Sequence, residues 1–142
     1  MMKEFRDELG AVVSAVEQRR REQEALMRAA TEAAKQRRND FIQFRSEVIR
    51  PLLEVAKSVL GERHYQVMLE DEDRGEPHIF LEVPACGATL IFSVGASPIR
   101  MLRRGQPMAG HHAFMLTAHE QLTEVIVRKA IGTFVENLLD PK

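Results

Sequence analysis

The histidines are the first candidates for a functional site in this sequence, since imidazole is the commonest metal ligand and transfers protons near neutral pH. There are five of them: His64, His78, His111, His112 and His119. His111 and His112 are adjacent and precede a predicted strand, in which successive side chains point to opposite faces, so the two cannot hold one ion. His78 and Glu82 share a strand face but stand about 13 Å apart, too far for direct proton transfer. We therefore predict ordinary surface histidines, with no catalytic and no metal-binding residue.

Two other features have simpler interpretations than the chemistry they first suggest. The run from Asp71 to Gly75 has the acidity of a calcium loop but lacks its remaining ligands, and it is typical of a solvated hairpin tip. Cys86 is the only cysteine and has no partner for an internal disulfide, so we interpret it as a structural thiol in a turn. The sequence contains no glycine-rich phosphate loop, nucleophile elbow or Cys-x-x-Cys pair. We predict no cofactor and favour a protein that is not an enzyme.

Several arginines could bind phosphate groups if the fold brought them together. They are Arg19, Arg20, Arg21, Arg37, Arg38, Arg100, Arg103 and Arg104. The net charge of −1 argues against a protein dedicated to nucleic acid, whose affinity comes mainly from neutralised phosphates. The chain also has no tryptophan and a single tyrosine, Tyr65, which leaves few platforms for stacked bases. Nucleic acid is therefore the least favoured partner, although a local basic patch stays open.

Length and composition describe one ordinary domain. With 142 residues and 44% hydrophobic side chains, the chain can bury roughly two thirds of the surface that its unfolded form exposes. Residues 1–8 mix charges of both signs and contain no apolar run, which argues against a secretory signal or a transmembrane helix there. We expect a cytoplasmic protein with no membrane partner.

A long helix over residues 2–38 is the clearest structural prediction. This segment contains no proline and is rich in Ala, Glu, Gln, Arg and Leu, which lose the least free energy on entering a helix. Glu17 and Arg21, and likewise Glu24 and Arg28, are acid-first pairs one turn apart that support it locally. Such a helix would be about 50 Å long, which exceeds the width of the domain that follows.

An apolar seam runs along this helix with the 3-4 spacing of a coiled coil. It comprises the predicted interface residues Phe5, Leu9, Val12, Val16, Leu26 and Ala30. Arg19 and Gln23 interrupt it, within a stretch that is polar on every side. We expect the helix to pair with a copy of itself, as a homodimer, or with another helical protein. The alternative is an antiparallel hairpin in which the helix folds back on the next helix of the same chain.

We predict that the remaining residues, 39–142, form a globular α+β domain that begins with a second helix. Asn39 and Asp40 are residue types that cap helix starts, and apolar side chains from Phe41 to Leu60 lie almost all around the helix that follows. Pro51 lies inside this pattern, so either the helix kinks there or a new helix begins. Gly61 is expected to cap the end of the helix.

Between residues 64 and 116 the hydrophobic period changes to two, which predicts an antiparallel β-meander of four to five strands. The apolar face of the first three strands comprises Tyr65, Val67 and Leu69, then Ile79, Leu81 and Val83, then Leu90, Phe92 and Val94. The fourth strand is expected at 99–103 and the fifth at about 112–116, with a loop over 105–110 between them.

A C-terminal helix packed on the sheet completes the predicted fold. Thr117-Ala118-His119-Glu120 matches a capping box, and the helix should run from there to about Leu139. Its apolar residues cover more than half of its circumference, so we expect it to contact both the sheet and a helix.

Two classes of function fit these features. The favoured hypothesis is a non-enzymatic protein-interaction or oligomerisation module, in which the long helix mediates self-association or partner binding. The alternative is a small-ligand-binding domain or enzyme with a pocket between the sheet and the helices. The residues expected to line that pocket are Met68, Phe80, Ile91, Met101 and Met115.

Overall fold

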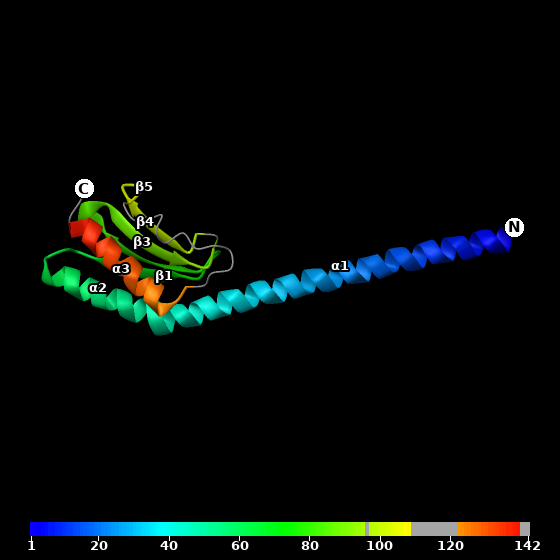
Figure 1. The fold of residues 1–142 in the computed structure, drawn as a ribbon, viewed down its shortest axis with the longest axis horizontal. Coiled ribbons are helices and arrows are strands. Elements are labelled where there is room, and N and C mark those ends of the chain that lie inside the picture. The colour runs from blue at the N-terminus through cyan, green and yellow to red at the C-terminus, as the bar shows by residue number, and fades with distance from the viewer. Residues whose placement is uncertain (96, 109–121, 140–142) are drawn as a thin grey trace. The chain divides into compact units, whose positions relative to one another are not determined.

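The computed structural model describes residues 1–95, 97–108 and 122–139. Within these residues the order of elements is a long helix, a second helix, a five-stranded sheet and a final helix, so the predicted α+β fold is confirmed. The chain divides into two compact units, Met1–Arg37 and Arg38–Lys142. In the second unit, helices α2 (Arg50–Glu62) and α3 (Glu124–Leu139) lie side by side over one face of the sheet (Figure 1).

Helix α1 spans Met2–Phe44 and passes through Asn39 and Asp40 without a break. The prediction that these two residues cap a new helix is therefore wrong. Asn and Asp each cost only about 0.7 kcal/mol relative to alanine inside a helix. The burial of Phe41 in the core, directly after these two residues, is a gain larger than that cost.

A single π turn, η1 (Arg45–Ile49), joins α1 to α2, which has Pro51 in its first turn. The N–H of Arg50 donates to the carbonyl of Arg45, five residues earlier. Proline explains the turn, because it has no N–H and its ring would clash with the carbonyl four residues before it in a regular α-helix. The expected break at Pro51 is thus confirmed as a new α-helical segment after a π turn.

Helix α2 ends at Glu62, and Gly61 stays helical, so the predicted glycine cap is wrong. His64 takes the left-handed conformation instead, with a φ of 69°, and its N–H donates to the carbonyl of Gly61. The N–H of Tyr65 donates to the carbonyl of Leu60, which completes a Schellman motif. Leu60 is fully buried and Tyr65 packs against the core, so packing fixes the end of the helix beyond the glycine.

The sheet is the predicted antiparallel meander, with strand order β1-β2-β3-β4-β5. Its strands are β1 (Met68–Glu72), β2 (His78–Val83), β3 (Ala88–Ser93), β4 (Ile99–Arg103) and β5 (Gln106–Pro107). Strand β4 has the predicted bounds. Strand β5 lies in the segment predicted as a loop, because Arg104 and Gly105 both have positive φ and form a two-residue hairpin turn. The strand predicted at 112–116 lies outside the described residues.

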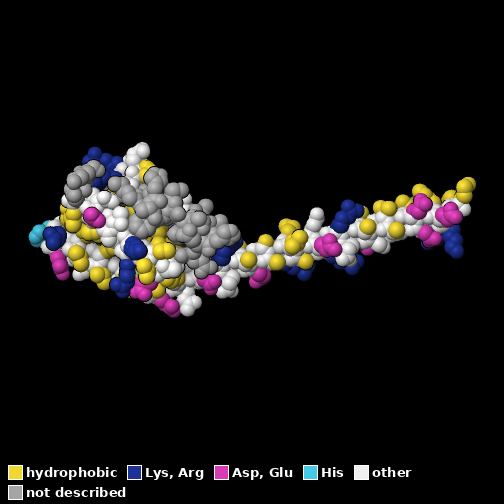
Figure 2. All heavy atoms as spheres, viewed as in Figure 1, with side chains coloured by type: hydrophobic (Ala, Val, Ile, Leu, Met, Phe, Trp, Pro, Cys, Tyr) yellow, Lys and Arg dark blue, Asp and Glu magenta, His cyan; other side chains and the backbone are white. Residues whose placement is uncertain are grey.

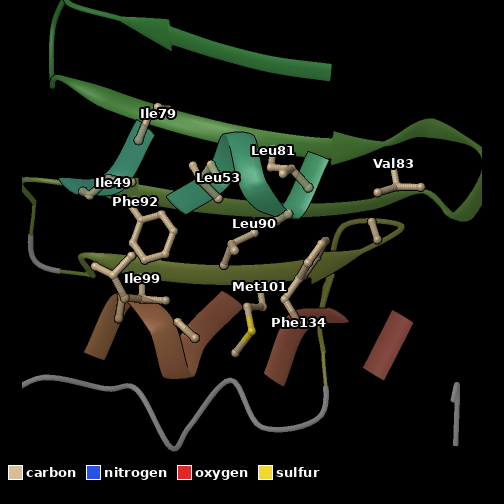
Figure 3. Close-up of a cluster of buried hydrophobic side chains, with 14 of the residues drawn as sticks. Ile49, Leu53, Ile79, Leu81, Val83, Leu90, Phe92, Ile99, Met101 and Phe134 are labelled. Carbon is tan, nitrogen blue, oxygen red and sulfur yellow. The ribbon is translucent and has the colours of Figure 1, made fainter. Parts of the chain in front are cut away.

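The core lies between one face of the sheet and the helical segments η1, α2 and α3 (Figure 3). Alternate residues of β2 and β3 are buried on this face as predicted, namely Ile79, Leu81, Val83, Leu90 and Phe92. The helical segments contribute the buried residues Ile49, Leu53, Leu60, Val127 and Phe134. This helix-covered face is called the inner face, and the opposite one the outer face.

Helix α3 begins at Glu124, after the non-helical residues Leu122 and Thr123, so it does not run continuously from residue 117. The predicted capping box at 117–120 lies outside the described residues. The hydroxyl of Thr123 accepts a hydrogen bond from the N–H of Ile126 at 3.3 Å and caps the observed start. The helix contacts both β3 and α2, as expected.

Candidate interaction surface

The seam predicted on the N-terminal helix is exposed along its whole length. The exposed fractions of its large side chains are 57% for Phe5, 48% for Leu9, 57% for Val12, 43% for Val16 and 70% for Leu26, and Ala30 is exposed as well. The three- and four-residue spacing puts these residues in one stripe of the observed helix. Figure 2 shows hydrophobic side chains recurring along this helix between charged ones.

Two further apolar residues widen the stripe on one side. Val13 is 54% exposed and Met27 is 71% exposed, and each directly follows a seam residue. None of residues 1–37 is buried or half-buried in the structure. Scattered exposed apolar residues are normal on any protein, but two rows of them on the same helix face, as here on either side of Arg19 and Gln23, are typical of an interaction surface.

The polar middle of the helix satisfies its side chains locally. The predicted pair forms between Glu17 and Arg21, with 3.7 Å between their charged atoms. Gln18 donates to the carboxylate of Glu22 at 3.2 Å, and Arg19 Nε donates to the carbonyl of Ala15 at 3.5 Å. These contacts follow the helix axis, so they stabilise the helix itself and leave both apolar parts of the seam uncovered.

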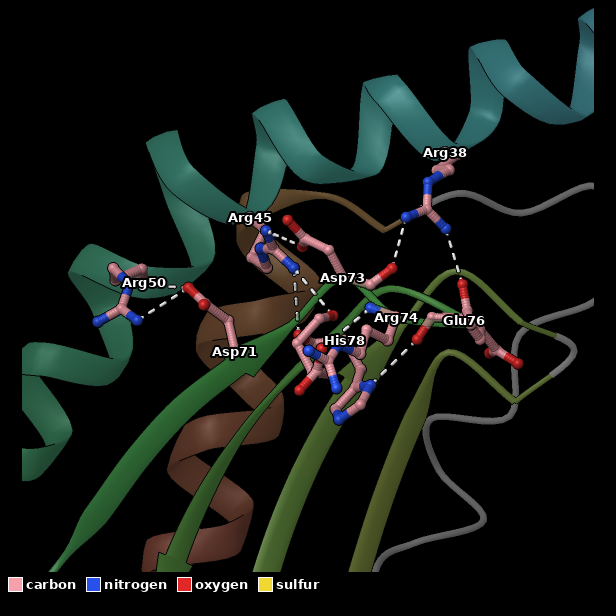
Figure 4. A network of polar contacts seen from close by, with 10 residues as sticks. Arg38, Arg45, Arg50, Asp71, Asp73, Arg74, Glu76 and His78 are labelled. Atoms are coloured by element: carbon pink, nitrogen blue, oxygen red, sulfur yellow. Dashed lines mark hydrogen bonds and ion pairs between the residues drawn. The ribbon is translucent and has the colours of Figure 1, made fainter.

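In the second unit the principal polar feature is Arg45, whose side chain is only 6% exposed. Its Nη2 lies 2.6 Å from Oδ1 of Asp73, and its Nη1 donates to the carbonyls of Glu72 at 3.4 Å and His78 at 3.3 Å (Figure 4). Its Nε has no hydrogen-bond partner in the described part of the chain. A guanidinium from the helix thus ties together both strands of the β1–β2 hairpin.

Two more arginines of the same helical stretch bind this hairpin. Arg38 donates to the carbonyls of Asp73 and Gly75 at its tip. Arg50 donates to Oδ2 of Asp71 through Nη2 at 2.8 Å and through Nε at 3.3 Å. The hydrogen bond from Arg50 holds the pKa of the Asp71 carboxyl below its ordinary value, against the opposing effect of partial burial. The acidic run is exposed, as expected of a solvated tip, and its residues Asp71 and Asp73 also bind arginines of the helix.

The π turn makes this arrangement possible. Arg45 and Arg50 are five residues apart and would point about 140° apart around a regular α-helix. The extra residue of the π turn brings them to within about 40°, the relation of residues four apart. Both then face the hairpin (Figure 4). The sequence shows an acidic turn and three arginines that could bind it, but the π turn that aligns Arg45 with Arg50 could not be found without the structure.

Two of the five histidines, His64 and His78, belong to the part of the chain that the structure describes. Among the residues that the structure describes, no group of three or more His, Cys, Asp or Glu side chains could hold a metal ion. His78 Nδ1 donates to the carbonyl of Glu76 at 3.0 Å, and its ring stacks on Phe80 with 6.1 Å between centroids. His64 terminates α2. The other three histidines, His111, His112 and His119, lie outside the described residues.

The residues proposed to line a ligand pocket do not lie together. Phe80 and Ile91 are cross-strand neighbours on the outer face, and the register places Met68 on that face too. Met101 is fully buried on the inner face, opposite Leu90. Met115 lies outside the described residues. The sheet itself therefore separates Met101 from the other three.

Two of the arginines considered for phosphate binding serve the fold instead. Arg38 holds the β1–β2 hairpin through its carbonyls, and Arg103 Nη2 donates to the carbonyl of Leu138 at the end of α3, at 3.4 Å. Both guanidinium groups thus have structural partners, which weakens the case for a phosphate-binding surface built on them.

No protein-family model, curated protein or solved structure matches the chain. Fold and surface therefore define its class on their own: an α+β protein whose N-terminal helix presents an exposed apolar seam. None of the helices described here combines the length and the apolar character needed to cross a membrane.

Proposed function

We propose that the protein is a non-enzymatic interaction module, in which the N-terminal helix associates with another helix, from a second copy of this chain or from a different helical protein. The observation that supports the proposal is the exposure of the entire seam on a helix whose residues 1–37 bury no side chain. We further propose a cytoplasmic location, which is supported by a single cysteine, Cys86, with no disulfide partner in the chain.

The physical basis of this proposal is that most helices in proteins are stabilised by packing against another part of the structure. Propensity and local ion pairs leave an isolated helix marginal in water, and packing of an apolar face supplies most of the stability of protein helices. The seam provides such a face, with large side chains that are 43% to 70% exposed. Complete burial of each would contribute about 1–2 kcal/mol, since roughly half of its surface is already covered. Association with a second apolar helix face would supply that burial.

The test is the molar mass of the full chain by light scattering over a concentration series. The seam variant combines Leu9→Glu with Leu26→Glu, which places charges in both apolar parts while keeping a good helix former at each position. The matched control combines Ser14→Glu with Ala25→Glu, which adds the same charge at exposed positions away from the seam. Circular dichroism of each variant checks that the helix itself still forms.

We expect the wild type and the control to have at least twice the chain mass of 16.2 kDa, and the seam variant to have the mass of one chain. A second comparison uses a chain that starts at Lys35, which keeps Arg38 and its bonds to the hairpin and should also be monomeric. A wild-type chain that stays monomeric at every concentration and has the helicity of the seam variant would contradict the self-association arm of the proposal.

A further inference from the structure

We infer that the helix pairs with a second copy of itself in antiparallel orientation, in the register that places Leu9 of each chain against Leu26 of the other. This inference rests on the proposed self-association and adds its partner, direction and register. It follows from the order of side-chain sizes and charges along the exposed seam.

The two ends of the seam differ in side-chain size: Phe5 starts it and Ala30 ends it, and the same spacing extends it to Met2 on one side and Ala33 on the other. In a parallel, in-register pair each residue faces itself. Two Phe5 rings would then hold the helices apart at one end, while two Ala30 methyl groups would leave a gap at the other, although helix separation varies only between about 8 and 10 Å. In the antiparallel register Phe5 faces Ala30 and Met2 faces Ala33. At both ends of the interface a large side chain then faces a small one, so both ends fit the same helix separation.

The two polar residues that interrupt the seam, Arg19 and Gln23, also favour antiparallel pairing of the two helices. A parallel pair would place Arg19 against Arg19 and Gln23 against Gln23 inside the seam, which brings like charges together in a partly dry interface. The antiparallel register places Arg19 against Val16 and Gln23 against Val12. Arg19 already leans along its own helix, with Nε on the carbonyl of Ala15, so its stem can cover the valine while its charge stays in water.

The distribution of charge along the helix also favours antiparallel pairing. Residues 1–16 carry two cationic and three anionic side chains, a balance of −1. Residues 17–37 carry six cationic and four anionic side chains, a balance of +2. The antiparallel register puts the first half of each helix beside the second half of the other. Parallel pairing would put each half of the helix beside the same half of the other chain, which carries the same net charge.

The extent of the seam suits a second copy as partner. In this register residues 2–33 overlap over about 47 Å, and the twofold axis crosses the pair between residues 17 and 18. Each chain would bring eight large apolar side chains into the interface: Met2, Phe5, Leu9, Val12, Val13, Val16, Leu26 and Met27. With exposed fractions between 43% and 83%, they correspond to a buried area on the order of 1,200 Å² for the pair, which reaches the range of stable dimers.

Orientation is tested by distances between nitroxide labels in the full-length dimer. The background carries Cys86→Ala, and single cysteines are introduced as Glu4→Cys or Gln18→Cys, two exposed positions that share one place in the seven-residue repeat. Antiparallel pairing predicts about 40 Å along the axis between the two labels at position 4 and less than about 20 Å between those at position 18. Parallel pairing predicts short distances at both positions.

The molar mass of the same labelled samples separates the two proposals. A dimer with short distances at both positions overturns the antiparallel inference and leaves self-association standing. A chain of 16.2 kDa with no coupling between labels overturns both. Only a dimer with a long distance at position 4 and a short one at position 18 supports the inference.

Register is tested by disulfide formation in the same background. Chains with Leu9→Cys, mixed with chains carrying Leu26→Cys, should form a mixed disulfide that joins one chain of each kind, because the two positions face each other. Each variant alone should stay uncrosslinked. Crosslinking of each variant with itself, and not with the other, contradicts the register.

Discussion

The ion pair between Arg45 and Asp73 should respond very differently to the removal of its two partners. The side chain of Arg45 is 6% exposed, whereas that of Asp73 is 59% exposed. Removal of the arginine leaves a carboxylate that water already solvates. Removal of the carboxylate's charge leaves a guanidinium that is out of water. We therefore expect Asp73→Asn to destabilise the protein more than Arg45→Met, although both break the same contact.

The magnitudes follow from the environment of each group. Breaking a buried pair by removing one partner costs about 3–5 kcal/mol, and the exposure of Asp73 reduces our expectation for Asp73→Asn to about 2–3 kcal/mol. In Arg45→Met, two long hydrogen bonds to the carbonyls of Glu72 and His78 are lost. The buried Nε, which has no hydrogen-bond partner among the residues that the structure describes, disappears at the same time. These changes partly offset each other and leave a cost of about 1 kcal/mol.

The assay is urea denaturation of the full chain at one protein concentration, followed by tyrosine fluorescence. The single tyrosine, Tyr65, packs against the core of the second unit, and there is no tryptophan to mask it. The double variant should be about as stable as Arg45→Met alone, because Asp73 without its partner is a surface residue. As a control, Arg50→Met and Asp71→Asn should cost similar amounts, since their side chains are 38% and 37% exposed. A larger loss for Arg45→Met than for Asp73→Asn, or strict additivity in the double variant, would refute the reasoning.

Three further outcomes are expected from the second unit. Because Arg50 lowers the pKa of Asp71 in the folded state, this ion pair stabilises the protein at neutral pH, by less than about 1 kcal/mol for so exposed a pair. That stabilisation is lost as the pH falls below about 4. The difference in unfolding free energy between the wild type and Asp71→Asn should therefore shrink over that pH range. His64→Gly should raise the free energy of unfolding by about 0.5–1 kcal/mol in urea titrations, since glycine adopts the left-handed conformation of this residue without strain, and no change or a loss would contradict the assigned cap. Phe134→Ala should cost about 3–5 kcal/mol by the same titrations, because the ring is fully buried between α3 and the sheet, whereas Val125→Ala on the exposed side of α3 should cost little.

Several features of this protein follow from local sequence alone. The long helix, its seam from Phe5 to Ala30 and the bounds of β4 were all predicted, because propensity, the 3-4 spacing and the period of two depend only on residues near one another. The core faces of β2 and β3 follow for the same reason, since alternation assigns each side chain to one face. The candidate surface was predictable too, because its residues belong to one helix.

Only the tertiary structure decided where local preferences give way to packing. Asn39, Asp40 and Gly61 have the residue types of helix ends, yet all three stay helical. Their preferences amount to less than about 1 kcal/mol each, whereas burying a side chain such as Leu60 contributes about 1.5–3 kcal/mol. The π turn that aligns Arg45 with Arg50 depends likewise on contacts with a hairpin 21 to 33 residues further along the chain. Sequence therefore determined the elements and the seam, while burial across distant segments determined where the helices end and which charges they hold.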